Sequence, residues 1–220
     1  MNIFRISADL MHLVSIFLLL LKIEAHKSCR GISLRTQFLY VLVFVSRYLD
    51  LFWNFHSLYN SIMKVFFIVS SVAIVYLMKF RQPYAKTYDK KSDTFRIEFL
   101  IVPSLLLAFV WNEGFTIVEI LWAFSIFLES VAILPQLLVV QKAAREQSGR
   151  IENLTSHYVF CLGGYRTLYL INWAYRLLTE EVYSDWIAWI AGLVQTAVYI
   201  DFFYYYLKSR WAGEPMALPV

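Results

Sequence analysis

The chain has 220 residues, of which 60% are hydrophobic and 18% aromatic, and its mean hydropathy is +0.56. One soluble core of this size cannot bury so much apolar surface, so the composition excludes an ordinary soluble domain and indicates a polytopic membrane protein. The net charge of +4 is not gathered in a basic aromatic patch, which argues against nucleic-acid binding. Cys29 and Cys161 lie far apart in a loop and an apolar segment, and they indicate neither a disulfide framework nor a metal cluster.

Seven apolar segments follow one another along the chain, and several approach the roughly 20 residues that a spanning helix needs. They cover residues 6–21, 38–55, 62–78, 97–111, 117–140, 154–175 and 186–207. Pro135 lies within the fifth segment and predicts a kink there. We therefore expect an all-α membrane protein with seven transmembrane helices, forming one domain over residues 1–220 with a short tail from about residue 208.

The distribution of lysine and arginine predicts the orientation in the membrane, because basic residues stay on the cytosolic side. The connections at 55–61, 112–116 and 177–184 contain no lysine or arginine, whereas the connections that alternate with them are basic. The N-terminus is therefore expected to be lumenal or extracellular and the C-terminus cytosolic.

Arg47 and Asp50 stand inside the apolar second segment. An ionisable side chain in hydrocarbon costs a few kcal/mol or more unless it is paired or faces a wet cavity, so both residues are functional candidates. Their spacing of three also allows a second interpretation, in which they form a mutually neutralising pair on one helical face.

Five basic residues fall in or at the ends of apolar segments: Arg5, Arg47, Lys64, Arg166 and Arg176. A rise of about 1.5 Å per residue places Arg5, Arg47 and Arg176 in one layer near the lumenal face, together with Glu119 and Trp122. This layer has more cations than pairing inside a membrane requires. It indicates a ligand with more than one acidic group, and one cationic group for Glu119 and Trp122 to receive.

A second layer lies two or three turns deeper and contains His12, Glu129, Tyr165 and Arg166. An imidazole in this setting can titrate near physiological pH, which indicates a pH switch. The alternative is a polar cluster that only fixes the packing of the helices.

The second and sixth segments share the pattern R-x-L-x-L, at residues 47–51 and 166–170. This internal sequence repeat favours two three-helix bundles related by an axis along the membrane normal, with the ligand site at their interface.

The sequence resembles the KDEL receptors, the ER lumen protein-retaining receptors, over essentially its whole length. The matching blocks are MNIFR at 1–5, RYLDLF at 47–52, TFRIEF at 94–99, EILW at 119–122, LESVAILPQ at 128–136, YRTLY at 165–169, NW at 172–173 and DFF at 201–203. The resemblance implies a fold similar to SWEET and PQ-loop transporters, with two three-helix bundles joined by a linker helix.

The resemblance also implies a function. The ligand would be a C-terminal tetrapeptide of the Lys/His-Asp-Glu-Leu type, which is a receptor-read address. The receptor would bind this signal in the Golgi in a pH-dependent way and return the escaped ER protein that carries it to the ER. Such a protein is a multi-pass membrane protein of the ER, cis-Golgi and transport vesicles, in contact with membrane lipid and with COPI and COPII coat components. It is not an enzyme and needs no cofactor.

Residue roles carry over by position. Arg47 would bind the terminal carboxylate of the peptide, Arg5 its glutamate and Arg176 its aspartate, while Glu119 and Trp122 would receive its basic first residue. The other roles are shared by sets of residues: Asp50, Tyr169, Asn172 and Trp173 as further lining groups; His12, Glu129, Tyr165 and Arg166 as the pH-sensitive lock; Asp185 and Asp201 as positions linked to transport; Lys208 and Arg210 as coat contacts in the tail.

The chain departs from the family pattern in two places. Gly114 stands where family members carry an aspartate, beside Glu113, and the tail lacks the lysine cluster that some members present to the coat.

Two rival functions remain. A SWEET-like small-solute transporter has the same fold, but three arginines at one mouth argue against a neutral sugar. An enzyme is less well supported, since no metal triad, nucleophile elbow or phosphate loop accompanies His12, Glu129 and Tyr165.

Overall fold

The computed structural model describes residues 2–52, 54–55, 57–180 and 185–219. Within these residues the regular secondary structure is helical, apart from one β-bridge between Arg150 and Ala217. The elements are α1 (Ile3–His26), α2 (Leu34–Arg47), the 3-10 helix η1 (Leu49–Phe52), α3 (Leu58–Phe80), α4 (Tyr84–Thr87), α5 (Glu98–Val110), α6 (Ile117–Val131), α7 (Leu134–Glu146), α8 (Asn153–Thr179) and α9 (Trp186–Ala212).

The starts of five helices are fixed by polar caps. In each case the side chain of the residue before the helix accepts a backbone N–H of the first turn, which satisfies a donor that has no partner within the helix. The capping residues are Asn2 for α1, Ser33 for α2, Ser57 for α3, Thr116 for α6 and Asp185 for α9.

Four helical stretches are long and apolar enough to cross a membrane: Ile3–His26, Leu58–Phe80, Ile117–Glu146 and Trp186–Ala212. The other three apolar segments of the sequence correspond to α2 with η1, to the shorter apolar helix α5, and to the 27-residue α8. The chain is therefore an all-helical protein built to cross a membrane more than once.

The third of these stretches is broken in the middle. Helix α6 ends at Val131 and α7 begins at Leu134, with Pro135 in the first turn of α7. Proline is tolerated there because a residue in the first turn needs no intrahelical N–H bond. The kink predicted at Pro135 is present as this break.

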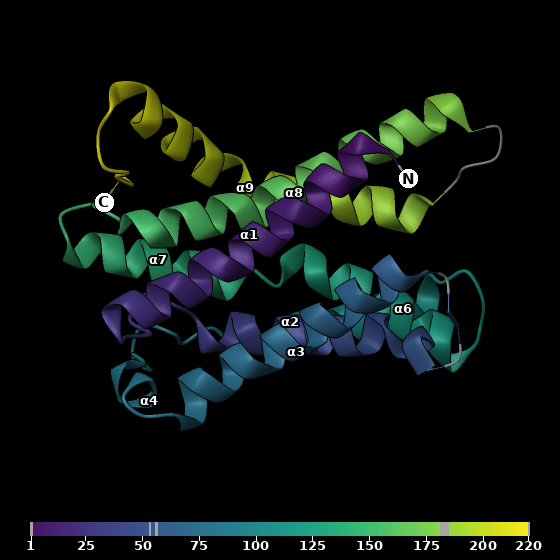
Figure 1. Cartoon of the computed structure of the whole chain (residues 1–220), viewed down its shortest axis with the longest axis horizontal. Coiled ribbons are helices and arrows are strands. Elements are labelled where there is room, and N and C mark those ends of the chain that lie inside the picture. Colours follow the sequence, from purple (N-terminus) through teal and green to yellow (C-terminus); the bar gives the residue numbers. More distant parts are fainter. Residues whose placement is uncertain (1, 53, 56, 181–184, 220) are drawn as a thin grey trace.

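Helix α1 lies along α8, and α2 lies between α3 and α6, while α9 contacts both α6 and α8 (Figure 1). Glycines allow the closest approaches of α8. A Cβ at Gly163 would lie 2.4 Å from Cδ1 of Tyr199 in α9, and a Cβ at Gly164 would lie 2.4 Å from the terminal methyl of Met11 in α1. The contact between α1 and α8 brings His12 of α1 close to Tyr165 and Arg166 of α8, which are far apart in the sequence.

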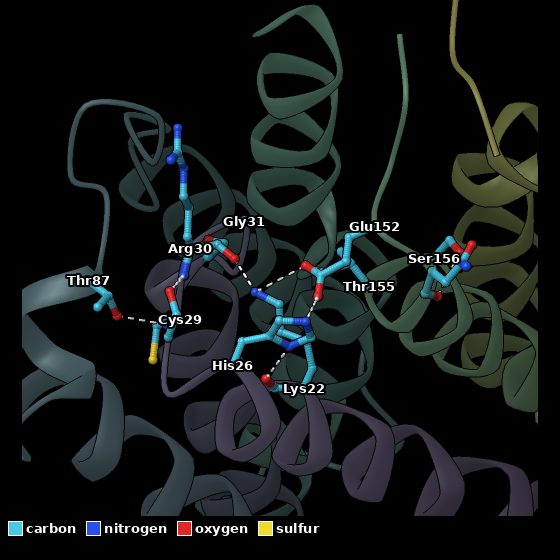
Figure 2. A network of polar contacts seen from close by, with 12 residues as sticks. Lys22, His26, Cys29, Arg30, Gly31, Thr87, Glu152, Thr155 and Ser156 are labelled. Atoms are coloured by element: carbon cyan, nitrogen blue, oxygen red, sulfur yellow. Dashed lines mark hydrogen bonds and ion pairs between the residues drawn. The ribbon is translucent and has the colours of Figure 1, made fainter. Parts of the chain in front are cut away.

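The two ends of the molecule differ. Helix α4 and the C-terminus lie at one end, and the start of α1 lies towards the other (Figure 1). At the α4 end, Glu152 joins α1 to the start of α8. Its carboxylate is 3.5 Å from Nζ of the buried Lys22 and 3.2 Å from Nε2 of His26, and both side chains point towards it (Figure 2).

The C-terminal segment folds back on the connection between α7 and α8. The N–H of Ile151 donates to the carbonyl of Met216 at 2.9 Å, and the N–H of Leu218 donates to the carbonyl of Gly149 at 2.9 Å. Met216 is fully buried. Helix α9 continues through Lys208 to Ala212, so the segment expected as a tail begins as helix.

Candidate functional site

Two adjoining cavities lie among the helices. The first has a volume of about 270 Å³ and is lined from α1, α2, α3, α6 and α8 and from the start of α9. The second has a volume of about 510 Å³, and its lining includes Asp50, Glu113 and Glu119. Arg47, Tyr48, Lys64 and Trp122 line both.

Glu129 of α6 forms the floor of the first cavity, with 1% of its side chain exposed. Nη1 of Arg47 lies 2.5 Å from its carboxylate, and Nη2 of Arg166 and the hydroxyl of Tyr165 also contact it. The Nε of Arg47 donates to Oγ of Ser125 at 3.1 Å. A carboxylate buried this deeply is stable only with such partners, so two guanidiniums share one anion.

His12 lies beside this cluster. Its ring stacks on Tyr165 with centroids 4.1 Å apart and an interplanar angle of 4°, and on Phe67 at 4.5 Å. The four residues predicted for the deeper layer, His12, Glu129, Tyr165 and Arg166, therefore lie together. Arg47, which its backbone depth placed in the upper layer, joins them because its long side chain reaches down to Glu129.

Arg5 lies higher in the same cavity, where its Nη2 donates to the neutral Oδ1 of Asn60 at 3.0 Å. The ion pairs found within the described part of the chain do not include Arg5. This cation is therefore placed to receive an anionic ligand group.

Asp9 was not predicted as a site residue. It is buried and accepts hydrogen bonds from the hydroxyl of Tyr59 in α3, at 2.8 Å, and from the hydroxyl of Tyr169 in α8. It thereby joins helices from both sides of the cavity. Its spacing of four from Arg5 and three from His12 puts it on the same face of α1, which was a signal available in the sequence.

Lys64 is a second residue that the sequence left without a role. Its Nζ lies 2.6 Å from Oδ2 of Asp50 and 5.8 Å from the ring centroid of Tyr48. The spacing allowed a pairing of Arg47 with Asp50; the ion pairs that the structure describes for these two residues join Arg47 to Glu129 and Asp50 to Lys64. A lone lysine in an apolar segment was the available signal.

Arg176 does not line either cavity. Its guanidinium donates to Glu180 at 2.8 and 2.7 Å, and these hydrogen bonds hold the pKa of Glu180 below its usual value. Tyr169 and Trp173 line the first cavity, whereas Asn172 is buried without being part of its lining. The structure thus brings Arg5 and Arg47 into one cavity but leaves Arg176 outside it.

The second cavity contains the acidic residues expected to receive a cation. Glu113 and Glu119 line it together with Trp122. Burial raises the pKa of Glu113, and the charges of Asp185 and Glu119 raise it further. Glu113 therefore supplies a carboxyl at this mouth, close to Gly114.

The remaining predicted residues are spread along α9. Asp185 caps α9 by accepting the N–H of Ala188 at 2.9 Å and lines the first cavity. Asp201 is exposed and lines neither cavity. Lys208 and Arg210 are exposed near the opposite end of the helix.

The arrangement suits a ligand with several acidic groups and at least one cation, because both cavities are lined by carboxylates as well as by basic side chains. Among the described residues, no three His, Cys, Asp or Glu side chains are grouped to hold a metal ion. Fold and site together define a multi-pass helical membrane protein with a charged binding pocket between its helices.

Comparison with known proteins identifies the family. The family model for the ER lumen protein retaining receptor matches residues 28–176. The chain is 54% identical to the ER lumen protein-retaining receptor A of Arabidopsis thaliana and 53% identical to the receptor of Petunia hybrida, each over 100% of both chains. It is 52% identical to the receptor of Entamoeba histolytica over 99% of both chains. The chain belongs to the ER lumen protein-retaining receptor family, which is a family of receptors and not of enzymes.

Proposed function

We propose that this protein is a Golgi-to-ER retrieval receptor that binds the C-terminal KDEL or HDEL-type signal of escaped ER proteins. The observation that carries the proposal is the charged cavity in which Arg5 and Arg47 lie above the Glu129 cluster. A peptide ending in Asp-Glu-Leu brings three carboxylates, and charge-assisted hydrogen bonds to guanidinium are the strongest contacts available to them. Full-length identity of 52–54% to proteins named as retaining receptors supports the same function.

Each part of the peptide has a proposed partner. Arg47 binds the terminal carboxylate, Arg5 the glutamate and Arg176 the aspartate, while Glu119 and Trp122 receive the basic first residue. Asp50, Tyr169, Asn172 and Trp173 complete the lining. In this proposal Arg176, in the last turn of α8, exchanges its contact with Glu180 for one with the aspartate of the peptide.

Binding is proposed to depend on pH through His12, Glu129, Tyr165 and Arg166. When the terminal carboxylate of the ligand draws Arg47 towards itself, Glu129 loses one of its two guanidinium partners. A protonated His12 then restores the positive charge beside the cluster. Proton uptake and peptide binding therefore favour each other, so affinity is high at acidic Golgi pH and falls at the neutral pH of the ER.

The finer fold and location are also proposals. Residues 1–220 form one domain of seven crossings, as two three-helix bundles joined by a linker helix, with the N-terminus lumenal and the C-terminus cytosolic. Support comes from the connections without lysine or arginine and from the position of α4 and the C-terminus at one end (Figure 1). The protein resides in the ER, cis-Golgi and transport vesicles.

Transport requires partners on the cytosolic side. Asp185 and Asp201 are proposed to link ligand binding to transport. COPI and COPII components are proposed to recognise the cytosolic end, where Lys208 and Arg210 are exposed. The surrounding lipid contacts the apolar outer faces of the helices.

The test is binding of a peptide ending in Lys-Asp-Glu-Leu to the purified receptor between acidic and neutral pH. We expect binding that is tight in acid, weaker at neutral pH and abolished when the peptide C-terminus is amidated. His12→Ala should flatten the pH profile. A receptor that binds neither peptide at any pH, but takes up a neutral solute in proteoliposomes, would establish the transporter function instead.

A further inference from the structure

We propose that Asp9 is a positioning residue for the ligand. It fixes the hydroxyls of Tyr59 and Tyr169 so that their oxygens accept hydrogen bonds from main-chain N–H groups of the bound peptide. The inference rests on the proposed function, since it concerns the same acidic peptide. It deepens that function, because it gives the peptide main chain a place of recognition in addition to the charged groups.

The first observation is a carboxylate in the wall of a cavity that is proposed to take an acidic ligand. Asp9 is only 7% exposed and lines the first cavity, one helical turn from Arg5. The ion pairs found within the described part of the chain do not include Asp9. A bare negative charge at this place would oppose a ligand with three carboxylates, so the carboxylate has to be covered.

The second observation is that two phenol hydroxyls cover this carboxylate. Tyr59 of α3 donates to Oδ2 of Asp9 at 2.8 Å, and Tyr169 of α8 donates to Oδ1, so each oxygen has its own donor. Both tyrosines line the first cavity. The ring of Tyr169 packs against Tyr165 and Trp173, with centroid distances of 6.3 and 6.0 Å. The ligand therefore meets the two phenol oxygens at this wall of the cavity.

The carboxylate also sets the polarity of both hydroxyls. A phenol has one O–H donor, and its oxygen can accept at the same time. An ionised carboxylate can only accept, so the hydrogen of each hydroxyl is committed to Asp9 and each phenol oxygen is left as an acceptor. The charge of the carboxylate strengthens these hydrogen bonds. Two acceptors of fixed polarity thus face the cavity, one from α3 and one from α8.

The donors that match these acceptors are peptide N–H groups. The arginines provide for the carboxylates of the ligand, but a peptide that leaves water also needs acceptors for its main-chain N–H groups. Asp9 lies between Arg5, four residues before it, and His12, three residues after it. Because Arg5 is proposed to bind the glutamate and Arg47 the terminal carboxylate, the N–H groups of the glutamate and the leucine lie between these two arginines, beside the two phenols.

This arrangement selects for a peptide. A small polycarboxylate could satisfy the arginines, but it has no N–H group for the two phenol oxygens and would leave them unmatched. A peptide C-terminus supplies carboxylates and N–H groups together. The ligand class is therefore narrower than a compound with several acidic groups.

The test compares amide and ester forms of a peptide ending in Lys-Asp-Glu-Leu, with the full-length receptor in detergent at mildly acidic pH. Each ester replaces one main-chain N–H by oxygen and leaves every side chain and charge in place. The ester that removes the N–H of the glutamate or of the leucine should bind the wild type roughly three- to tenfold more weakly. The ester that removes the N–H of the aspartate is the comparison within the peptide and should bind more tightly than the weaker of these two.

Receptor variants then identify the acceptor. For at least one of Tyr59→Phe and Tyr169→Phe, the loss caused by one ester should disappear, because the oxygen that received the N–H is absent. Asp9→Asn should weaken binding of the amide peptide and reduce the ester loss, since the new amide group donates to one phenol and that phenol turns its O–H towards the cavity. If Asp9 acted only through its charge, the same variant would instead bind the acidic peptide more tightly. The two phenylalanine variants also cover the case in which Asp9→Asn fails to fold.

The matched control is Tyr84→Phe. Tyr84 likewise donates its hydroxyl to a carboxylate of α1, that of Glu24, but at the far end of the helix and outside both cavities, so this variant should change neither the affinity nor the ester losses. The inference is refuted if no ester weakens binding to the wild type, if both phenylalanine variants keep the full ester losses, or if Asp9→Asn strengthens binding with those losses unchanged. A wild-type receptor that does not bind the amide peptide at any pH would instead refute the proposed function.

Discussion

Replacing Glu129 with glutamine tests whether its carboxylate neutralises two buried guanidiniums. Arg47 and Arg166 have only 14% and 6% of their side chains exposed, and both contact Glu129. Glu129→Gln keeps the shape but leaves two buried cations without an anion between them. Loss of one partner from a buried ion pair costs about 3–5 kcal/mol. For a chain of this length, that loss lowers the melting temperature by roughly 10 °C.

The assay is thermal unfolding of the purified receptor in detergent, with Arg166→Gln and the double variant Glu129→Gln/Arg166→Gln as the matched set. Arg166→Gln should cost less than Glu129→Gln, because Glu129 keeps Arg47 and Tyr165. The loss of unfolding free energy in the double variant should be about 1–3 kcal/mol smaller than the sum of the losses in the two single variants, since the double variant restores part of the charge balance. Additive effects of the two substitutions would refute the shared-anion interpretation.

Two further predictions concern packing and pH. Gly163→Ala should destabilise the receptor by about 1–3 kcal/mol, because its Cβ would meet the rigid ring of Tyr199 at 2.4 Å. Gly164→Ala should be close to neutral, because the flexible end of the Met11 side chain can move. Equal melting temperatures of the two variants would contradict this prediction. The pKa of Glu113 is raised in the unliganded receptor. A cationic ligand residue beside it lowers that pKa, so binding releases protons in the pH range where this carboxyl titrates and there opposes the loss of affinity on raising the pH. Glu113→Gln should therefore make that loss steeper in a peptide titration, and an unchanged slope would count against a role of Glu113 at this mouth.

Much of the framework was determined by the sequence itself. The apolar segments indicated membrane helices; each of the seven contains helix in the structure, and four helical stretches are long and apolar enough to cross a membrane. Pro135 predicted the break between α6 and α7 because a proline has no N–H for the helix. These features depend on residues that are close in sequence, so local patterns carry them.

The composition of the site was predictable only in part. Charge in an apolar segment is expensive, so Arg47, Glu129 and Arg166 could be recognised as candidates without any structure. Estimated depth also grouped His12 with Glu129 correctly. Depth along a helix follows from counting residues, and this is why the layers could be anticipated.

The partners of each charge were decided only by the tertiary structure. Arg47 contacts Glu129 of α6, although Asp50 is its neighbour in sequence, and Asp50 contacts Lys64 of α3. Arg176 was expected in the same layer as Arg5 and Arg47 but lies outside both cavities. The physical reason is the rotation of each helix about its own axis. Counting residues along a helix gives the position of a side chain along the helix axis. Its partner depends on the direction in which the side chain points from that axis and on which helix packs there. Those two quantities arise from the contacts of distant segments, such as α1 with α8, and no local pattern in the chain encodes them.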